Sequence, residues 1–323
     1  VFLDGSTGSG NGVGLVVQNN LVETNLTGVR VENLTTTAFA AFTVQDNQFA
    51  IQQQEYDLPP VLGGDADTEV GNAAEERTTS ISMAVIDGTA VPTLLNNVIT
   101  DDGDDDLGGV GDANPSGRND GAFYGYLLRG VKVNNGPVTI DHSGLTGTSI
   151  SGAMQGIAIL DGSVGTESDF AITDVEMDGF AGVANLEDVN FHAGVFVFTS
   201  GLPSSAITTT GSITNVTVRN TDVPDTANDP GGEEPSAGLY FGGFSALDGN
   251  GNFSQSISVT NATIEDNANR GIHTRGDNAT VTVTQSTFSG NGNSPASGNP
   301  GVSVFARQGA SLTVTESEIV AGG

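Results

Sequence analysis

Short segments in which apolar and polar residues alternate recur along the whole chain, separated by turn residues. Eight of them begin with a small residue followed by alternating apolar residues, and we call these the small-residue-led segments: Gly14–Val17, Ser82–Val85, Gly125–Leu128, Gly156–Ile159, Gly194–Val197, Gly238–Phe241, Gly271–Thr274 and Gly301–Val304. Alternation with a period of two is typical of β-strands, and no sustained period of 3.6 residues accompanies it. The pattern therefore predicts an all-β chain.

A second motif follows each small-residue-led segment, and it consists of two apolar residues five positions apart. These five-spaced pairs are Leu26/Val31, Leu94/Ile99, Ile140/Leu145, Ile172/Met177, Ile213/Val218, Val259/Ile264, Val283/Phe288 and Val314/Ile319. Side chains of a flat strand alternate between its two faces, so an odd spacing cannot keep both residues on one face. A bend between two strands is expected inside every pair.

The two motifs keep their form while the distance between successive copies varies, which places the extra residues in loops. Constant strands, variable loops and a regular inward apolar set predict a solenoid of three short strands per coil. We therefore expect one domain over residues 1–323, a right-handed parallel β-helix of about eight coils with variable loop insertions. Residues 35–80 lack a clean coil and are either a long insertion or a degenerate turn. A β-sandwich or a propeller would need regular hairpins or four-stranded blades, and neither period occurs.

The coils GIHTRGDNATVTVTQSTFSGNG (271–292) and GVSVFARQGASLTVTESEIVAGG (301–323) resemble those of the pectin-lyase-like β-helix superfamily. The resemblance covers most of residues 125–323 and extends more weakly to the N-terminal part. It implies a right-handed parallel β-helix. It does not imply one activity, because that superfamily includes polysaccharide lyases, glycoside hydrolases, phage tailspikes, adhesins and surface structural proteins.

The solenoid interpretation predicts which side chains face inward. One aliphatic row is expected inside, and the threonine that follows each of its members is expected outside: Ile172, Ile213, Val259, Val283 and Val314 inward, and Thr173, Thr214, Thr260, Thr284 and Thr315 outward. A flat face of small hydroxyl side chains suits lateral packing against a second copy. Asn267 and Asn291 each lie three residues after the second residue of a five-spaced pair, so we expect them to stack inside the solenoid.

The net charge is −30, with Lys132 the only lysine, so nucleic acid and anionic membrane surfaces would repel the chain. We expect cations, or a saline medium that screens self-repulsion, as in a halophilic or marine setting. No apolar run approaches the length that spans a bilayer, and the chain has no cysteine. An extracellular or cell-surface location is the expectation.

Three oxygen-rich loops are candidate calcium sites, because Ca²⁺ prefers six to eight oxygen ligands and carboxylates at alternate positions of a loop can converge on one ion. Their candidate ligands are Asp65 and Asp67; Asp101, Asp102, Asp104, Asp105 and Asp106; and Asp248, Asn250 and Asn252. None completes an EF-hand loop, and a solvated acidic loop is the alternative for each.

A weak catalytic candidate is Asp222 in the segment Asn220-Thr221-Asp222-Val223-Pro224-Asp225, which resembles the NTDxxD segment of polygalacturonases. That resemblance implies an acid/base role for Asp222, but the family's other motifs are missing, and inverting hydrolysis needs a second carboxyl group. The alternative is a turn in which Asn and Asp bond their own backbone. His142, His192 and His273 fall in different coils, so no histidine metal site is expected.

These observations favour a structural or adhesive protein of the cell surface or extracellular matrix that assembles with copies of itself. The chain opens and closes in apparent strands, Val1-Phe2-Leu3 and Glu318-Ile-Val320, with no amphipathic helix to cover the last coil. Because open coils expose unpaired backbone groups, head-to-tail association is expected, with lateral association as a second mode. The alternative is a polysaccharide-binding or polysaccharide-cleaving β-helix, with glycans as partners, so enzyme activity is left open.

Overall fold

The computed structural model describes residues 1–4, 15–24, 27–32, 42–51, 79–86, 91–100, 124–133, 136–153, 155–162, 167–180, 192–200, 207–221, 236–244, 253–292 and 302–320. These residues form strands and turns and no helix. The strands build three nine-stranded sheets in which every neighbouring pair runs parallel. The fold is a right-handed parallel β-helix, as the sequence predicts.

Sheet A comprises β1 (Phe2–Asp4), β4 (Thr27–Glu32), β7 (Thr79–Ile86), β10 (Tyr124–Val131), β13 (Gln155–Asp161), β16 (Ala193–Ser200), β19 (Ala237–Phe244), β22 (Arg270–Arg275) and β25 (Val302–Arg307). Sheet B comprises β2 (Leu15–Gln18), β5 (Phe42–Gln45), β8 (Pro92–Leu95), β11 (Val138–Asp141), β14 (Asp169–Thr173), β17 (Ile207–Thr214), β20 (Phe253–Thr260), β23 (Ala279–Thr284) and β26 (Ser311–Thr315). Sheet C comprises β3 (Leu21–Thr24), β6 (Gln48–Ile51), β9 (Val98–Thr100), β12 (Ile150–Ser151), β15 (Glu176–Phe180), β18 (Thr217–Thr221), β21 (Thr263–Glu265), β24 (Thr287–Ser289) and β27 (Glu318–Ile319).

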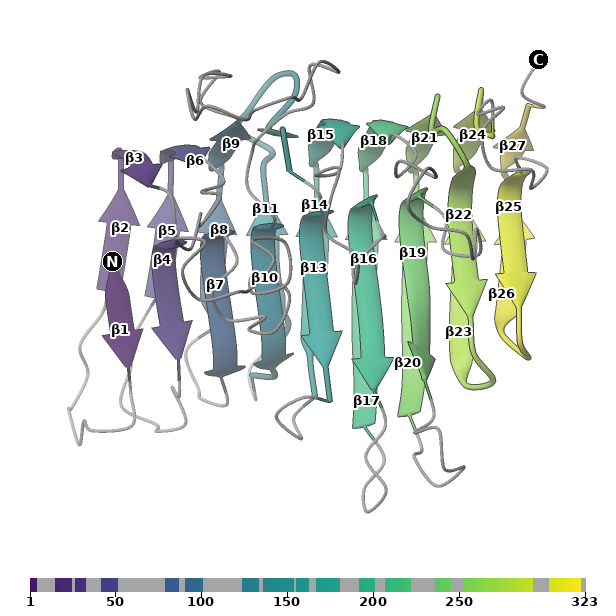
Figure 1. Cartoon of the computed structure of the whole chain (residues 1–323), viewed down its shortest axis with the longest axis horizontal. Helices are drawn as coiled ribbons and strands as arrows, with labels where there is room; N and C mark the ends of the chain where they lie inside the picture. Colours follow the sequence, from purple (N-terminus) through teal and green to yellow (C-terminus); the bar gives the residue numbers. More distant parts are fainter. Residues whose placement is uncertain are drawn as a thin grey trace, which may run out of the picture.

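Each coil contributes one strand to each sheet in the order A, B, C, and the coils stack into an elongated body (Figure 1). Sheets A and B face each other across the core, and the short strands of sheet C close the third side at the top of the view. The purple first coil and the yellow last coil lie at opposite ends.

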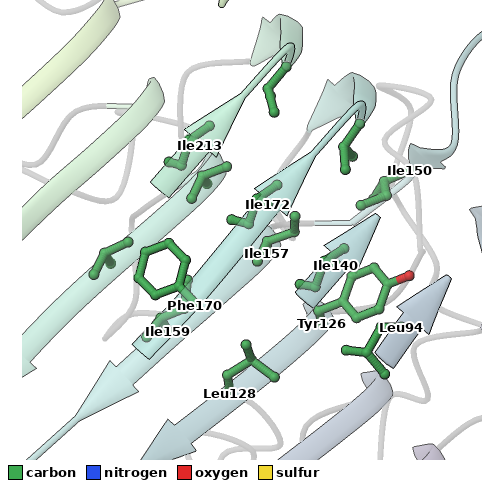
Figure 2. Close-up of a cluster of buried hydrophobic side chains, with 14 of the residues drawn as sticks. Leu94, Tyr126, Leu128, Ile140, Ile150, Ile157, Ile159, Phe170, Ile172 and Ile213 are labelled. Carbon is green, nitrogen blue, oxygen red and sulfur yellow. The ribbon is translucent and has the colours of Figure 1, made fainter. Parts of the chain in front are cut away.

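The core is one continuous column of stacked side chains. Figure 2 shows Leu94, Ile140, Ile172 and Ile213 following one another along adjacent strands of sheet B, each fully buried. Every coil buries its inner face only against its neighbours and the opposite sheets, which is the packing rule of a solenoid.

A single residue in the left-handed conformation makes the corner between sheets B and C in eight of the nine described coils. These residues are Asn19, Asp46, Asn96, Asp174, Asn215, Asn261, Gln285 and Glu316, with φ between 51° and 56°. Asn and Asp adopt this conformation at lower cost than most residues, which accounts for their frequency here. The turn of direction at this residue is why apolar residues five apart both point inward.

The inward and outward rows predicted for sheet B are confirmed. Ile172, Ile213, Val259 and Val283 are fully buried and stack in register, and Val314 packs partly buried against the same core. The threonines that follow them are half-buried or exposed. The stacking of Asn267 on Asn291 inside the solenoid is also confirmed, because both are buried and Asn267 Nδ2 donates to Asn291 Oδ1 at 2.8 Å.

The sequence assigned the strands of the first coils to the wrong sheets. Val17 belongs to sheet B, where it lies in β2 beside Val44, and Val31 belongs to sheet A beside Met83, so Leu26/Val31 is not a five-spaced pair. The five-spaced pairs of the first two coils are instead Val17/Val22 and Val44/Phe49. The structure describes nine coils where about eight are expected, and β5 and β6 lie within residues 35–80.

Three further assignments are corrected by the register. Ile150, not Leu145, stacks on Ile99 and Met177, because the corner after Ile140 is lengthened by residues 142–149. In sheet A, Tyr126 pairs with Ile81, so the small-residue-led segment of β7 begins at Ser80 rather than Ser82. The segment of β25 likewise begins at Ser303, because Ile272 pairs with Val304.

Candidate functional surfaces

Sheet A is largely apolar on both faces over the strands β10, β13, β16 and β19. All eight residues of β10 are buried, and the outward positions Leu127, Ala158, Phe196 and Tyr240 are no more than 5% exposed. They form two clusters that are separate from the central core. The sequence signal was the run of consecutive apolar residues in Tyr126–Leu128 and Val195–Phe198, which is typical of strands buried on both faces.

The outer face of sheet A ends in a row of rings at the C-terminal coils. Phe196, Tyr240, His273 and Phe305 occupy register-matched positions, and their successive ring centroids lie 4.8, 4.9 and 5.2 Å apart. Offset and edge-on ring pairs of this kind add to the stability that burial gives. The row joins the last four coils along their outer side.

Arg270 contacts two members of this row, His273 and Phe305. Its guanidinium lies 4.1 Å from the centroid of the Phe305 ring, and its Nη1 donates to His273 Nδ1 at 3.0 Å. Burial, followed by the charges of Arg270, Arg307 and Arg275, lowers the pKa of His273 to about 2. His273 is therefore a neutral hydrogen-bond acceptor at ordinary pH, and its role here is to anchor an arginine.

The outer face of sheet B carries small uncharged side chains in three rows. On β17, β20, β23 and β26, all twelve outward residues in register are serine or threonine: Thr210, Ser212, Thr214, Ser256, Ser258, Thr260, Thr280, Thr282, Thr284, Ser311, Thr313 and Thr315. The middle row continues through Ala171, Thr139, Thr93 and Thr43 to Val16. One outer row is broken at Asp169 and the other at Asp141, Leu95, Gln45 and Gln18, and all of these residues lie in strands before β17.

The outer face of sheet C is charged by contrast. Arg219 on β18 forms ion pairs with Glu176 and with Asp178, the latter at 2.8 Å between Nε and Oδ2, and Glu265 lies 3.8 Å from its Nη1. Hydrogen bonding to Asp178, the largest contribution, raises the pKa of Arg219. This network spans three successive coils and leaves an excess of carboxylates on the face.

A buried Tyr–His–Ser chain fills the lengthened corner between β11 of sheet B and β12 of sheet C. Tyr126 Oη lies 2.9 Å from His142 Nε2, and His142 Nδ1 lies 2.7 Å from Ser149 Oγ. All three residues are at most 1% exposed, and burial lowers the pKa of His142 to about 4. The chain resembles a proton relay in its composition, but its place inside the column gives it a structural role in supporting the inserted corner.

A second buried network crosses the corner between sheets A and B. Asp161 accepts hydrogen bonds from the backbone N–H groups of Gly130 and Ser168 at 3.0 and 2.9 Å, from Ser168 Oγ at 2.6 Å, and from Thr209 Oγ1. Thr209 continues through Thr199 to Gln255. Burial raises the pKa of Asp161, while these hydrogen bonds oppose the shift. Sequence reasoning missed this aspartate because nothing distinguishes it locally from exposed ones.

The residues predicted to bind calcium all lie outside the described residues: Asp65, Asp67, Asp101, Asp102, Asp104, Asp105, Asp106, Asp248, Asn250 and Asn252.

Asp222, the weak catalytic candidate, also lies outside the described residues. Its neighbours have structural roles, because Asn220 adopts φ 57° and donates to Asp178 at 2.7 Å, and Thr221 N–H donates to the buried Asn267. Within the described ranges, no group of three His, Cys, Asp or Glu side chains is placed to hold a metal, and no helix is long and apolar enough to span a membrane.

No protein-family model, curated protein or solved structure matches this chain.

Proposed function

We propose that the chain is a structural or adhesive β-helix of the cell surface or extracellular matrix, and that its copies associate end to end. The observation that carries this proposal is the in-register stacking of nine described coils, because each of the three parallel sheets can be extended by a further coil of the same shape. Of the coils that the structure describes, the first and the last have strands with one neighbour in each sheet.

The last coil leaves its inner side chains incompletely covered. Val304, Leu312 and Val314 are only partly buried, and Ile319 is 53% exposed. Their register partners one coil earlier, Ile272, Val281, Val283 and Phe288, are at most 1% exposed. Full burial of an exposed Val, Leu or Ile side chain contributes about 1.5–3 kcal/mol. Completing the burial of these four partly covered side chains contributes a part of that each, and so favours a further coil on this end.

The first coil offers a matching surface. Phe2 and Leu21 are each 63% exposed, and the corner residue Asn19 has φ 56°, close to the 51° of Glu316 in the last coil. Both terminal coils therefore turn between sheets B and C in the same way. A second copy can continue all three sheets, with β1, β2 and β3 beside β25, β26 and β27 of the first. Such a contact is heterologous and propagates into a fibre unless it closes a ring.

The edge of β26 also supplies unpaired backbone groups. The carbonyl of Thr315 accepts from the N–H of Gln285 in the preceding coil at 3.2 Å. Because successive residues of a strand direct their N–H and C=O groups to opposite sides, the N–H of Val314 points to the open edge. A proline there removes a donor that only an added strand would use.

Light scattering tests the proposal on Val314→Pro and on the matched variant Val314→Thr, which keeps the N–H and the β-branched shape. We expect the wild type and Val314→Thr to grow in mass with concentration in the presence of salt and calcium, and Val314→Pro to stop growing at the ends. A wild type that shows no concentration-dependent growth would contradict end-to-end association.

A further inference from the structure

We infer that the outer face of sheet B is a lateral interface at which two copies of this chain pack face to face. This surface is distinct from the terminal coils, so the inference does not depend on end-to-end association. We call it the hydroxyl face, and it consists of the outward residues of the nine strands of sheet B.

Charge is the first argument. The hydroxyl face carries two charged side chains, Asp141 and Asp169, although the protein has 39 acidic residues and a net charge of −30. Two copies that approach through the acidic face of sheet C would repel each other, as like charges do at any interface. The hydroxyl face is where two such acidic chains can meet at close range.

Shape is the second argument. The middle row, from Val16 on β2 to Thr313 on β26, contains no side chain larger than valine over nine strands in register. Facing sheets pack about 10 Å apart when their side chains are small enough to interdigitate. Ser256, Ser258, Thr280 and Thr282 are exposed, so they are available for such a contact.

Area is the third argument. Nine strands about 4.8 Å apart and about five residues wide cover roughly 650 Å². Two such faces together bury about 1,300 Å², which lies within the range of stable protein–protein interfaces, about 1,200–2,000 Å². The same patch on both copies gives an isologous contact, and a two-fold axis closes it at a dimer.

The two acids make the contact dependent on salt. Asp141 and Asp169 lie on the adjacent strands β11 and β14 near the middle of the face, so a two-fold axis there brings carboxylates of the two copies together. Asp169 accepts from Thr210 Oγ1 at 3.0 Å, and Asp141 accepts from the N–H of Ser143 at 2.8 Å. Asparagine preserves both acceptors, so Asp141→Asn with Asp169→Asn removes only the repulsion.

The test uses Val314→Pro as a background, so that growth at the ends does not obscure lateral pairing. Sedimentation of this variant is expected to give twice the mass of the chain. Adding Ser258→Asp with Thr282→Asp, which places two carboxylates on paired strands of the hydroxyl face, is expected to give a monomer. The matched control, Thr263→Asp with Thr287→Asp, places two carboxylates on paired strands of sheet C and is expected to leave the dimer intact.

The full chain gives a second measurement should the proline variant not fold. Asp141→Asn with Asp169→Asn is expected to lower the dissociation constant of the lateral dimer at least tenfold at low salt, and to have little effect in molar salt. A monomeric Val314→Pro variant with native circular dichroism, or equal loss of the dimer in both pairs of aspartate variants, would overturn the inference. Filaments without lateral pairing would contradict this inference and leave the proposed end-to-end association in place. Lateral dimers without filaments would support this inference and contradict end-to-end association.

Discussion

The side-chain amide of Asn267 donates to Asn291 Oδ1 at 2.8 Å, across two adjacent coils and inside the apolar column. The same side chain donates to the carbonyl of Val218 at 3.3 Å and accepts from the N–H of Thr221 at 3.2 Å. Asn267 therefore satisfies backbone groups of the preceding coil that have no water available to them. A second asparagine pair, Asn47 and Asn97, makes the same kind of hydrogen bond at the corner between sheets B and C of the second and third coils.

Replacing Asn267 with leucine is expected to lower the free energy of unfolding by about 2–4 kcal/mol. The leucine leaves a buried N–H and a buried carbonyl unsatisfied, and each costs about 1–3 kcal/mol. Urea unfolding followed by circular dichroism measures the change. Asn278→Ala, at an exposed turn position, is the control and should change stability by less than about 0.5 kcal/mol. Equal stability of the two variants would show that the stacked asparagines contribute nothing.

Asn261 tests the left-handed corner between sheets B and C, where its φ is 54°. Glycine adopts this conformation freely, whereas a β-branched residue pays the steric cost of left-handed backbone, about 1–2 kcal/mol or more. We expect Asn261→Gly to be nearly neutral and Asn261→Val to be clearly destabilising, as measured by melting temperature. A valine variant as stable as the glycine variant would mean that the corner is not built on this conformation.

Because His142 is buried in its neutral form, we expect the free energy of unfolding to fall in mild acid. Burial lowers the pKa of His142 in the folded protein to about 4, below the ordinary histidine value of 6.5, so the fold favours the neutral imidazole. That contribution is complete above pH 6.5 and is lost as the pH falls towards 4. Between pH 7 and 4.5, His142→Asn should lose about 2 kcal/mol less stability than the wild type does. The buried acid Asp161 acts with the opposite sign, but it is present in both proteins and cancels in this comparison. Parallel pH profiles for the two proteins would disprove the assignment.

Calcium is expected to raise the melting temperature, because a ligand that binds only the folded state stabilises it. The prediction rests on the sequence of the loop with Asp101, Asp102, Asp104, Asp105 and Asp106. Thermal unfolding in chelator and in millimolar Ca²⁺ measures the effect, and the variant with all five aspartates changed to asparagine is the control. An unchanged melting temperature of the wild type would remove the idea.

The sequence predicted the fold and the inward rows because strand alternation and the five-residue spacing are local signals. It misplaced the first coils because Gly14–Val17 alternates in the same way as a strand of sheet A, although it precedes a sheet B corner. It paired Ile140 with Leu145 because spacing alone cannot reveal that the inserted corner is supported by His142 and Ser149. The burial of the outer face of sheet A depends on long-range packing. Its only signal in the sequence is the runs of consecutive apolar residues, such as Tyr126–Leu128 and Val195–Phe198.

Electron microscopy of the intact chain in salt and calcium is the most direct test of self-association. The account predicts filaments with an axial repeat of roughly 43 Å, since nine coils stack at about 4.8 Å each. It also predicts that the filaments associate in pairs through the hydroxyl face, and that Val314→Pro yields short rods under the same conditions. Dispersed single rods of the wild type, at concentrations where the folded chain is abundant, would contradict the account.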